Sequence, residues 1–335
     1  MDKHFEFELG TKIPNQQIVI SDNVAEKRLW KENLLLARQL GNRKRSKAES
    51  IIRVIHRSHW ATRKLAALSL HSDFTFRELT IDISRGHSAD YIRILHLSDI
   101  HLDLEAPCAK GQSTFTESFY QFVTGLPKSA LEADIAVITG DLQDRIGTPL
   151  SPTLISALGK TLKHLKCPII SVLGNHDSLN TYSQQNTSLL QQSCPYGFST
   201  LINQICTVTK NNKPFLEIHG ADDTHYYKTY GKLPQAEGNT PKLLLAHSPI
   251  IADEASSAGY QLCLSGHTHA GQIRIPGISS TRWMKQIHKD KHHGLWRVGE
   301  MFGYTSAGIG CSGLPIRLRT KPEIVKITVK LPKTK

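Results

Sequence analysis

The stretch YIRILHLSDIHLD, residues 91–103, decides the fold class of this chain. It begins as a run of mostly apolar residues and changes at Ser98 to polar residues, which include Asp99 and His101. Apolar runs of this length are typical of strands that are buried on both faces of a sheet. In α/β proteins, ligands bind beyond the carboxyl ends of such strands. The stretch therefore predicts a buried strand that leads into a functional site.

The same pattern recurs in later stretches that begin with apolar residues and end with polar ones. They are ADIAVITGD (133–141), CPIISVLGN (167–175), KLLLAHSP (242–249) and YQLCLSGHTH (260–269). Three further stretches predict strands as well, namely FTFRELTIDI (74–83), FLEIHGADD (215–223) and PEIVKITV (322–329). Strands separated by connections of helical length are typical of α/β domains. We therefore expect an α/β fold.

Composition places the chain among ordinary globular proteins. Of its residues, 39% are hydrophobic and 21% are charged, which is typical of globular proteins. Its length of 335 residues suffices for one large domain or two smaller ones. Its six cysteines include no CxxC pair, so we expect reduced thiols rather than disulfides or a thiolate zinc site. The N-terminus lacks the apolar core of a signal peptide, and no apolar run approaches the roughly 20 residues of a transmembrane helix. A cytoplasmic location is expected.

The formal charge of +12 is distributed unevenly. Between Val24 and Leu70 there are twelve Lys or Arg and three Glu. This excess favours an anionic partner, which is nucleic acid, a membrane surface or a phosphate-bearing substrate. The region also predicts two helices, one closing near Gly41 and one over 46–70. We therefore expect a basic, largely helical extension over 1–73 and a catalytic domain over 74–335.

The polar residues that follow the predicted strands are of the types that bind metal ions. They are Asp99, His101, Asp141, Asn175, His176, Asp177, His247, His267 and His269. Imidazole, carboxylate and amide ligands without a thiolate suit Mn²⁺, Fe or Zn²⁺. One carboxylate can bridge two ions about 3.5–4 Å apart, which is the spacing used for hydrolysis at phosphorus. Asp141, central in the order, is the natural bridge.

Five motifs carry a specific resemblance to a known family. SDIHLD, TGDLQD, LGNHD, AHSP and SGHTHAGQ resemble the ordered motifs of the calcineurin-like metallophosphoesterases, and the match covers roughly residues 74 to 335. The resemblance implies a four-layer fold, in which two mixed sheets are flanked by helices, with a dinuclear metal centre at the sheet ends. It implies two divalent ions, for which we expect Mn²⁺ first and Fe or Zn²⁺ as alternatives.

The family roles transfer to this chain residue by residue. One ion is expected to bind Asp99, His101 and His269, and the other to bind Asn175, His247 and His267. Asp141 is expected to bind both ions. His176 resembles the catalytic histidine, and Asp177 is expected to orient it.

The closing segment GYTSAGIGCSGLPIRLRTKPEIVKITV (303–329) and HGADD (219–223) resemble a bacterial subgroup of this family. With the basic extension, the arrangement is similar to the UDP-2,3-diacylglucosamine hydrolases of lipid A biosynthesis in chlamydia-like bacteria. The resemblance implies release of UMP and 2,3-diacylglucosamine 1-phosphate at the inner leaflet, where basic residues bind anionic lipid. Candidate substrate-binding residues are Arg282, Trp283 and Lys285.

Several alternatives stay open at this point. A basic helical pair also suits a phosphodiesterase that acts on nucleic acid or cyclic nucleotides. A general phosphoesterase of the same family is a further alternative. The two helices could also simply pack on the catalytic domain and expose a solvated basic face.

Overall fold

The computed structural model describes ten parts of the chain. They are residues 5–10, 73–102, 115–144, 152–177, 191–224, 231–236, 238–274, 284, 286–312 and 316–333. The predicted helices over 24–70 lie outside the described residues, as do Arg282, Trp283 and Lys285.

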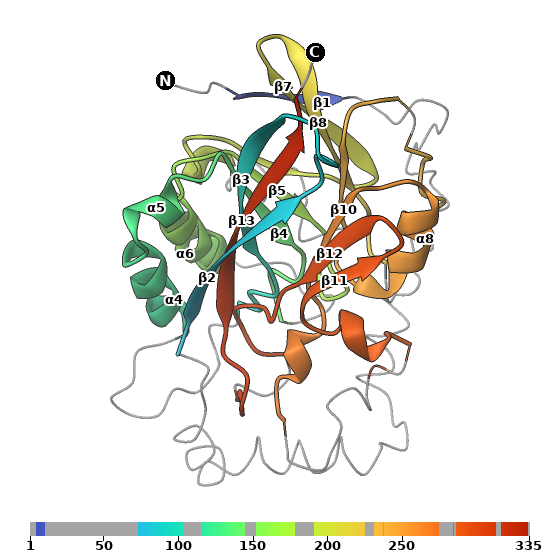
Figure 1. Ribbon diagram of the computed structural model, residues 1–335. Coiled ribbons are helices and arrows are strands. Elements are labelled where there is room, and N and C mark those ends of the chain that lie inside the picture. Colours follow the sequence, from blue (N-terminus) through green and yellow to red (C-terminus); the bar gives the residue numbers. More distant parts are fainter. Residues whose placement is uncertain are drawn as a thin grey trace, which may run out of the picture.

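Two mixed sheets form the centre of the molecule (Figure 1). Sheet A has seven strands in the order β1-β7-β8-β9-β10-β12-β11, and sheet B has six in the order β2-β13-β3-β4-β5-β6. The strands of sheet A are β1 (Phe5–Gly10), β7 (Gln204–Lys210), β8 (Lys213–Gly220), β9 (Lys242–Leu245), β10 (Leu262–Ser265), β11 (Gly294–Val298) and β12 (Met301–Thr305). The strands of sheet B are β2 (Thr75–Asp82), β3 (Ala89–Leu97), β4 (Ile135–Thr139), β5 (Ile169–Val172), β6 (Phe198–Thr200) and β13 (Glu323–Pro332).

The central strands of both sheets are parallel. In sheet B, β3, β4, β5 and β6 run parallel, while β13 is antiparallel to β3 and parallel to β2. In sheet A, β8, β9, β10 and β12 run parallel. β4 has the sequence IAVIT and every residue in it is buried, as expected for a parallel strand covered on both faces. The carboxyl ends of β3, β4 and β5 therefore meet at one edge of sheet B, and those of β9 and β10 at one edge of sheet A.

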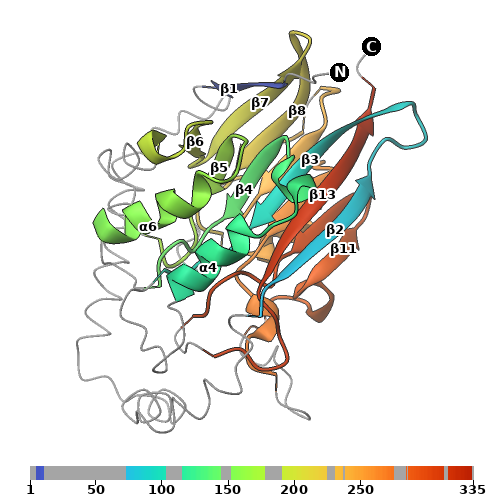
Figure 2. The ribbon, with the colours of Figure 1, turned by 90° about the vertical axis from the view of Figure 1, so that its left-hand side faces the viewer.

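Helices cover the outer face of each sheet. α4 (Phe115–Thr124), α5 (Lys128–Leu131) and α6 (Pro152–Leu162) lie against sheet B (Figures 1 and 2). α8 (Ala252–Ser257) lies beside sheet A (Figure 1). α6 starts with a proline, which suits the first turn, and it buries Ile155, Leu158 and Leu162 on one face. Short 3₁₀ turns lie at Pro249–Ile251 (η1), His269–Gly271 (η2) and Lys289–Lys291 (η4).

The buried apolar residues form three clusters that match the layers. One lies between sheet B and its helices, including Phe119, Leu158 and Ile138. The second fills the space between the sheets, and the third lies between sheet A and α8. The expected four-layer α/β fold is confirmed by this arrangement.

All eight stretches that the sequence predicts as strands contain a strand in the structure. β1 falls within the predicted extension 1–73, yet it pairs antiparallel with β7 and extends sheet A. Among the described residues, no helix is long and apolar enough to cross a bilayer.

Candidate metal centre

Nine predicted site residues follow the carboxyl ends of five strands. Asp99 and His101 follow β3, Asp141 follows β4, and Asn175, His176 and Asp177 follow β5. From the other sheet, His247 follows β9, and His267 and His269 follow β10. The structure brings the predicted metal ligands together at this edge, in two groups joined by Asp141.

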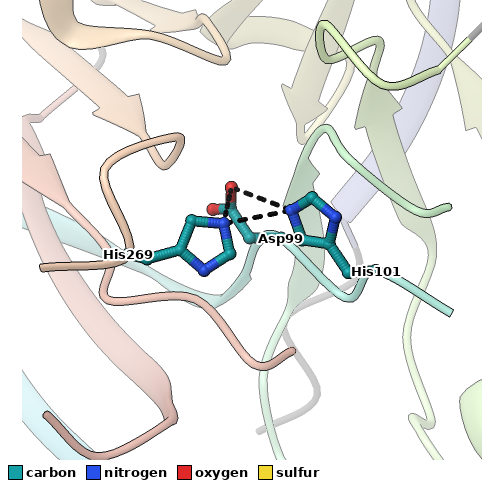
Figure 3. Close-up of side chains that lie close together, drawn as sticks. All are labelled: Asp99, His101 and His269. Carbon is teal, nitrogen blue, oxygen red and sulfur yellow. Dashed lines mark hydrogen bonds and ion pairs between the residues drawn. The ribbon is translucent and has the colours of Figure 1, made fainter. Parts of the chain in front are cut away.

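The first group consists of Asp99, His101 and His269 (Figure 3). The Nε2 atoms of His101 and His269 lie 3.0 Å apart. Oδ1 of Asp99 lies 3.4 Å from Nε2 of His269 and 3.9 Å from Nε2 of His101. All three residues are buried. One cation placed among these atoms would be shared by two imidazoles and a carboxylate.

The second group gathers around His247. Its Nε2 lies 3.1 Å from Nδ1 of His267 and 2.9 Å from Oδ1 of Asn175. Oδ2 of Asp141 lies 3.2 Å from His247 Nε2 and 3.4 Å from His101 Nε2. One oxygen of Asp141 therefore faces both groups, which is the place of a bridging ligand.

The hydrogen bonds on the far side of the rings fit metal ligands. Nδ1 of His101 lies 3.1 Å from Oδ1 of Asp144, and Nδ1 of His247 lies 2.7 Å from the carbonyl oxygen of Thr139. Because each Nδ1–H donates outward to an oxygen, the Nε2 lone pair points into the site, as in metal-binding histidines generally. Imidazole nitrogens about 3 Å apart beside two buried carboxylates form a donor set that suits divalent ions.

The electrostatics of the site also favour bound positive charge. Burial alone would lower the pKa of His101 and of His247, but Asp141 and neighbouring carboxylates outweigh it and raise both pKa values to about 10. Burial alone would raise the pKa of Asp141, but His247, His176 and His101 hold it well below its ordinary value. Burial, together with His101 and Arg317, keeps the pKa of His269 low. The carboxylates thus attract cations, and protons and metal ions compete for the same nitrogens.

Five predicted ligands have left-handed backbones. Asp99, His101, Asp141, His267 and His269 have φ between 45° and 71°. This region is uncommon for residues other than glycine, and such strain concentrates at functional sites.

Glycines allow the loops to approach these residues. A Cβ atom on Gly174 would be 2.8 Å from the carboxyl carbon of Asp141, and one on Gly308 would be 2.7 Å from Cβ of Asp99. The strand-end loops meet too closely for any other residue at these positions.

The hydrogen-bond partner of the His176 ring differs from the one expected from the sequence. Its Nδ1 lies 2.6 Å from the carbonyl oxygen of Asp144, so the ring is oriented by this carbonyl rather than by Asp177 as expected. The carboxylate of Asp177 instead accepts backbone N–H bonds from Asp141, Leu142 and Gly174 at 2.8–2.9 Å. The physical reason is that buried, unpaired N–H groups in two tight loops need an acceptor.

Asp144 is a site residue that the sequence reasoning missed. Its carboxylate orients His101 and its carbonyl orients His176. Its position three residues after Asp141, in the quoted motif TGDLQD, was the available signal.

Comparison with known proteins identifies the class to which this fold and site belong. The model of the calcineurin-like phosphoesterase family matches residues 92–271, which is more than half of the chain. The chain belongs to the calcineurin-like phosphoesterase family. The family binds divalent metal ions, and the chain is a metal-dependent phosphoester hydrolase.

Particular relatives are similar over different shares of their length. The chain is 28% identical to the uncharacterized metallophosphoesterase YkuE of Bacillus subtilis over 251 residues, 73% of this chain and 81% of that protein. It is 30% identical to the phosphodiesterase YaeI of Escherichia coli over 162 residues, 48% of this chain and 57% of that protein. It is 28% identical to a bovine transmembrane protein with metallophosphoesterase domain over 257 residues, 72% of this chain and 53% of that protein. The chain thus spans little more than half the length of the last two.

Proposed function

We propose that the chain is a dinuclear-metal phosphohydrolase whose substrate is UDP-2,3-diacylglucosamine. The enzyme would cleave the pyrophosphate of this substrate and release UMP and 2,3-diacylglucosamine 1-phosphate. The observation that carries the reaction type is the shared position of Asp141, whose Oδ2 lies 3.2 Å from His247 and 3.4 Å from His101. Asp99, His101 and His269 would hold one ion, and Asn175, His247 and His267 the other. Mn²⁺ is our first choice of metal.

The residues around the ions have separate tasks in this proposal. When bound, divalent ions activate water for attack and offset the negative charge that builds on the phosphoryl oxygens. Asp144 and Thr139 hold His101 and His247 with Nε2 facing inward. Nδ1–H of His176 donates to the carbonyl of Asp144, so Nε2 is the ring atom left to hold or release a proton at the leaving oxygen.

The choice of a lipid substrate is supported by charge and by the path of the chain. Residues 24–70 carry the basic excess, and the described fold resumes at Asp73, which pairs with Lys321 at 2.6 Å. Thr75 begins β2 and pairs with Glu323 of β13. The carboxylate of Glu323 accepts a hydrogen bond from the N–H of Ala307. The next residue, Gly308, lies against Asp99. The first described residues after the basic stretch therefore lie at the edge that carries the candidate metal centre.

This placement suits an enzyme that works on a lipid headgroup. Lys and Arg near an anionic surface contribute about 1 kcal/mol each to binding. The proposed location is peripheral contact with the inner membrane from the cytoplasmic side. Arg282, Trp283 and Lys285, which lie outside the described residues, would contact substrate in this proposal.

The alternative is a phosphodiesterase that acts on nucleic acid, cyclic nucleotides or a wider range of phosphoesters. A relative named as a phosphodiesterase, and the affinity of basic residues for any phosphate backbone, favour it. Binding to vesicles and to duplex DNA separates the two proposals. We expect flotation with vesicles that contain anionic lipid and no retention of duplex DNA at physiological salt.

The substrate is tested by incubating the Mn²⁺-loaded protein with UDP-2,3-diacylglucosamine and, separately, with bis-p-nitrophenyl phosphate. We expect UMP from the first and p-nitrophenol from the second. Hydrolysis of the synthetic diester without release of UMP would remove the lipid substrate and leave the hydrolase.

A further inference from the structure

Arg317 is a fully buried arginine beside the metal centre. Its Nε donates to the carbonyl oxygen of Gly310 at 2.9 Å. Its Nη2 donates to the carbonyl oxygens of Gly310 at 2.5 Å and Ala307 at 2.8 Å. The same Nη2 lies 3.3 Å from Nδ1 of His269. One guanidinium therefore contacts both a backbone segment and the ring of a predicted metal ligand.

That segment, residues 307–310, packs directly behind Asp99, and we call it the support segment. Ile309 N–H donates to the carbonyl oxygen of Ser98 at 2.9 Å, and Gly310 N–H donates to that of Asp99 at 2.7 Å. Gly308 has φ of 74°, and a Cβ atom there would lie 2.7 Å from Cβ of Asp99. Any movement of the support segment therefore changes the position of Asp99.

Glu323 holds the support segment from the other side. Its Oε1 accepts the Ala307 N–H at 2.8 Å, and its own N–H donates to the carbonyl oxygen of Gly308 at 3.0 Å. The peptide groups of Ala307 are thus fixed between a buried carboxylate and a buried guanidinium. Arg317 also reaches His269, so it links the support segment to the loop after β10.

We propose that Arg317 is a positioning residue for the ion on Asp99, His101 and His269, because it fixes the backbone behind Asp99 and the ring of His269 together. The proposal rests on the metal-centre assignment made above. Groups that hold metal ligands in place typically change metal affinity 10–100-fold when they are removed. The positive charge of Arg317 would by itself weaken a cation at His269. The direction of the change in affinity therefore separates positioning from simple repulsion.

Calorimetric titration of the chelator-stripped full chain with MnCl₂ tests the proposal. We expect two ions in the wild type. Arg317→Met should weaken one of the two binding steps at least tenfold and leave the other unchanged. Arg317→Lys keeps the charge but cannot reach both carbonyls with a planar fork, so it should lose metal affinity to an intermediate degree.

The matched control is Arg319→Met, since Arg319 lies two residues further along and is exposed. This variant should titrate like the wild type. Affinity in Arg317→Met that is unchanged or tighter would overturn the proposal.

A second readout distinguishes positioning from general damage to the fold. Turnover of bis-p-nitrophenyl phosphate by Arg317→Met should recover as Mn²⁺ is raised, with KM for the diester unchanged. Loss that no concentration of Mn²⁺ restores, in a variant that keeps the wild-type circular dichroism, would contradict a positioning role.

If Arg317→Met does not fold, Gly308→Ala takes its place, because its Cβ displaces the support segment from Asp99. The same loss in one step is expected, and wild-type affinity would overturn the proposal. A wild-type protein that binds no Mn²⁺ would instead remove the metal-centre assignment itself.

Discussion

At the scale of single residues, the proposed site separates the groups that would hold metal from the group that would move a proton. Asp141 faces both ligand groups through one oxygen, whereas the His176 ring bonds to the Asp144 carbonyl and stands T-shaped to His101 at 4.8 Å between ring centres. We therefore expect His176→Ala to keep its metal and to lose turnover by roughly 10²–10⁴-fold.

Asp141→Ala, in contrast, should lose both its metal and its turnover. Elemental analysis beside kcat checks both, and near-normal metal and rate in Asp141→Ala would contradict the assignment.

We expect His96 to make the stability of the fold depend on pH. Its ring is fully buried, and burial lowers its pKa to about 4 from an ordinary 6.5, with Glu323 opposing the shift. Between these values the unfolded chain binds a proton that the folded chain does not, so stability falls as the pH drops from 6.5 towards 4. The loss amounts to about 3 kcal/mol. His96→Gln, which keeps a polar atom for Thr139, should flatten this decline in urea denaturation at pH 7 and pH 5. An equal decline in both proteins would count against this explanation.

At the scale of elements, the site exists because loops after different strands approach each other closely. A Cβ atom on Gly266, after β10, would overlap the side chains of Ser98 and Asp99, after β3. Gly266→Ala should therefore push the two loops apart, lower metal affinity and cost about 1–3 kcal/mol of stability. Gly86→Ala is the control, because Gly86 has φ of 79° but no atom within 4 Å of a Cβ there. It should lose stability from backbone strain alone and keep its metal, as measured by dialysis and thermal unfolding.

The elements also explain what the sequence could and could not predict. β3, β4, β5, β9 and β10 are mostly or wholly buried, so they appear as apolar runs and the polar residues after them stand out. β7 and β11 combine buried residues with half-buried and exposed ones, and their mixed composition hid them. The partners of Asp177 and Asp144 depend on loops that meet only in three dimensions. The side chains that gather at the site could therefore be predicted from the sequence, whereas the groups that orient them could not.

At the scale of the whole molecule, the candidate metal centre takes its side chains from both sheets. Asp99, His101, Asp141 and Asn175 come from sheet B, and His247, His267 and His269 from sheet A. Ions that bind only the folded chain stabilise it by about 2.7 kcal/mol per site at a concentration of 100 Kd. Removal of metal with a chelator should therefore lower Tm by on the order of 10 °C, and added Mn²⁺ should restore it. A Tm that ignores both treatments would show that the sheets are joined without the ions.

The central claim is that side chains from both sheets gather around two cations that share Asp141. Anomalous diffraction from crystals grown with Mn²⁺ tests it most directly. We expect two peaks about 3.5–4 Å apart, one among Asp99, His101 and His269 and one among Asn175, His247 and His267, with Asp141 between them. A crystal with no anomalous peak among these residues, or with its manganese elsewhere, would contradict the account.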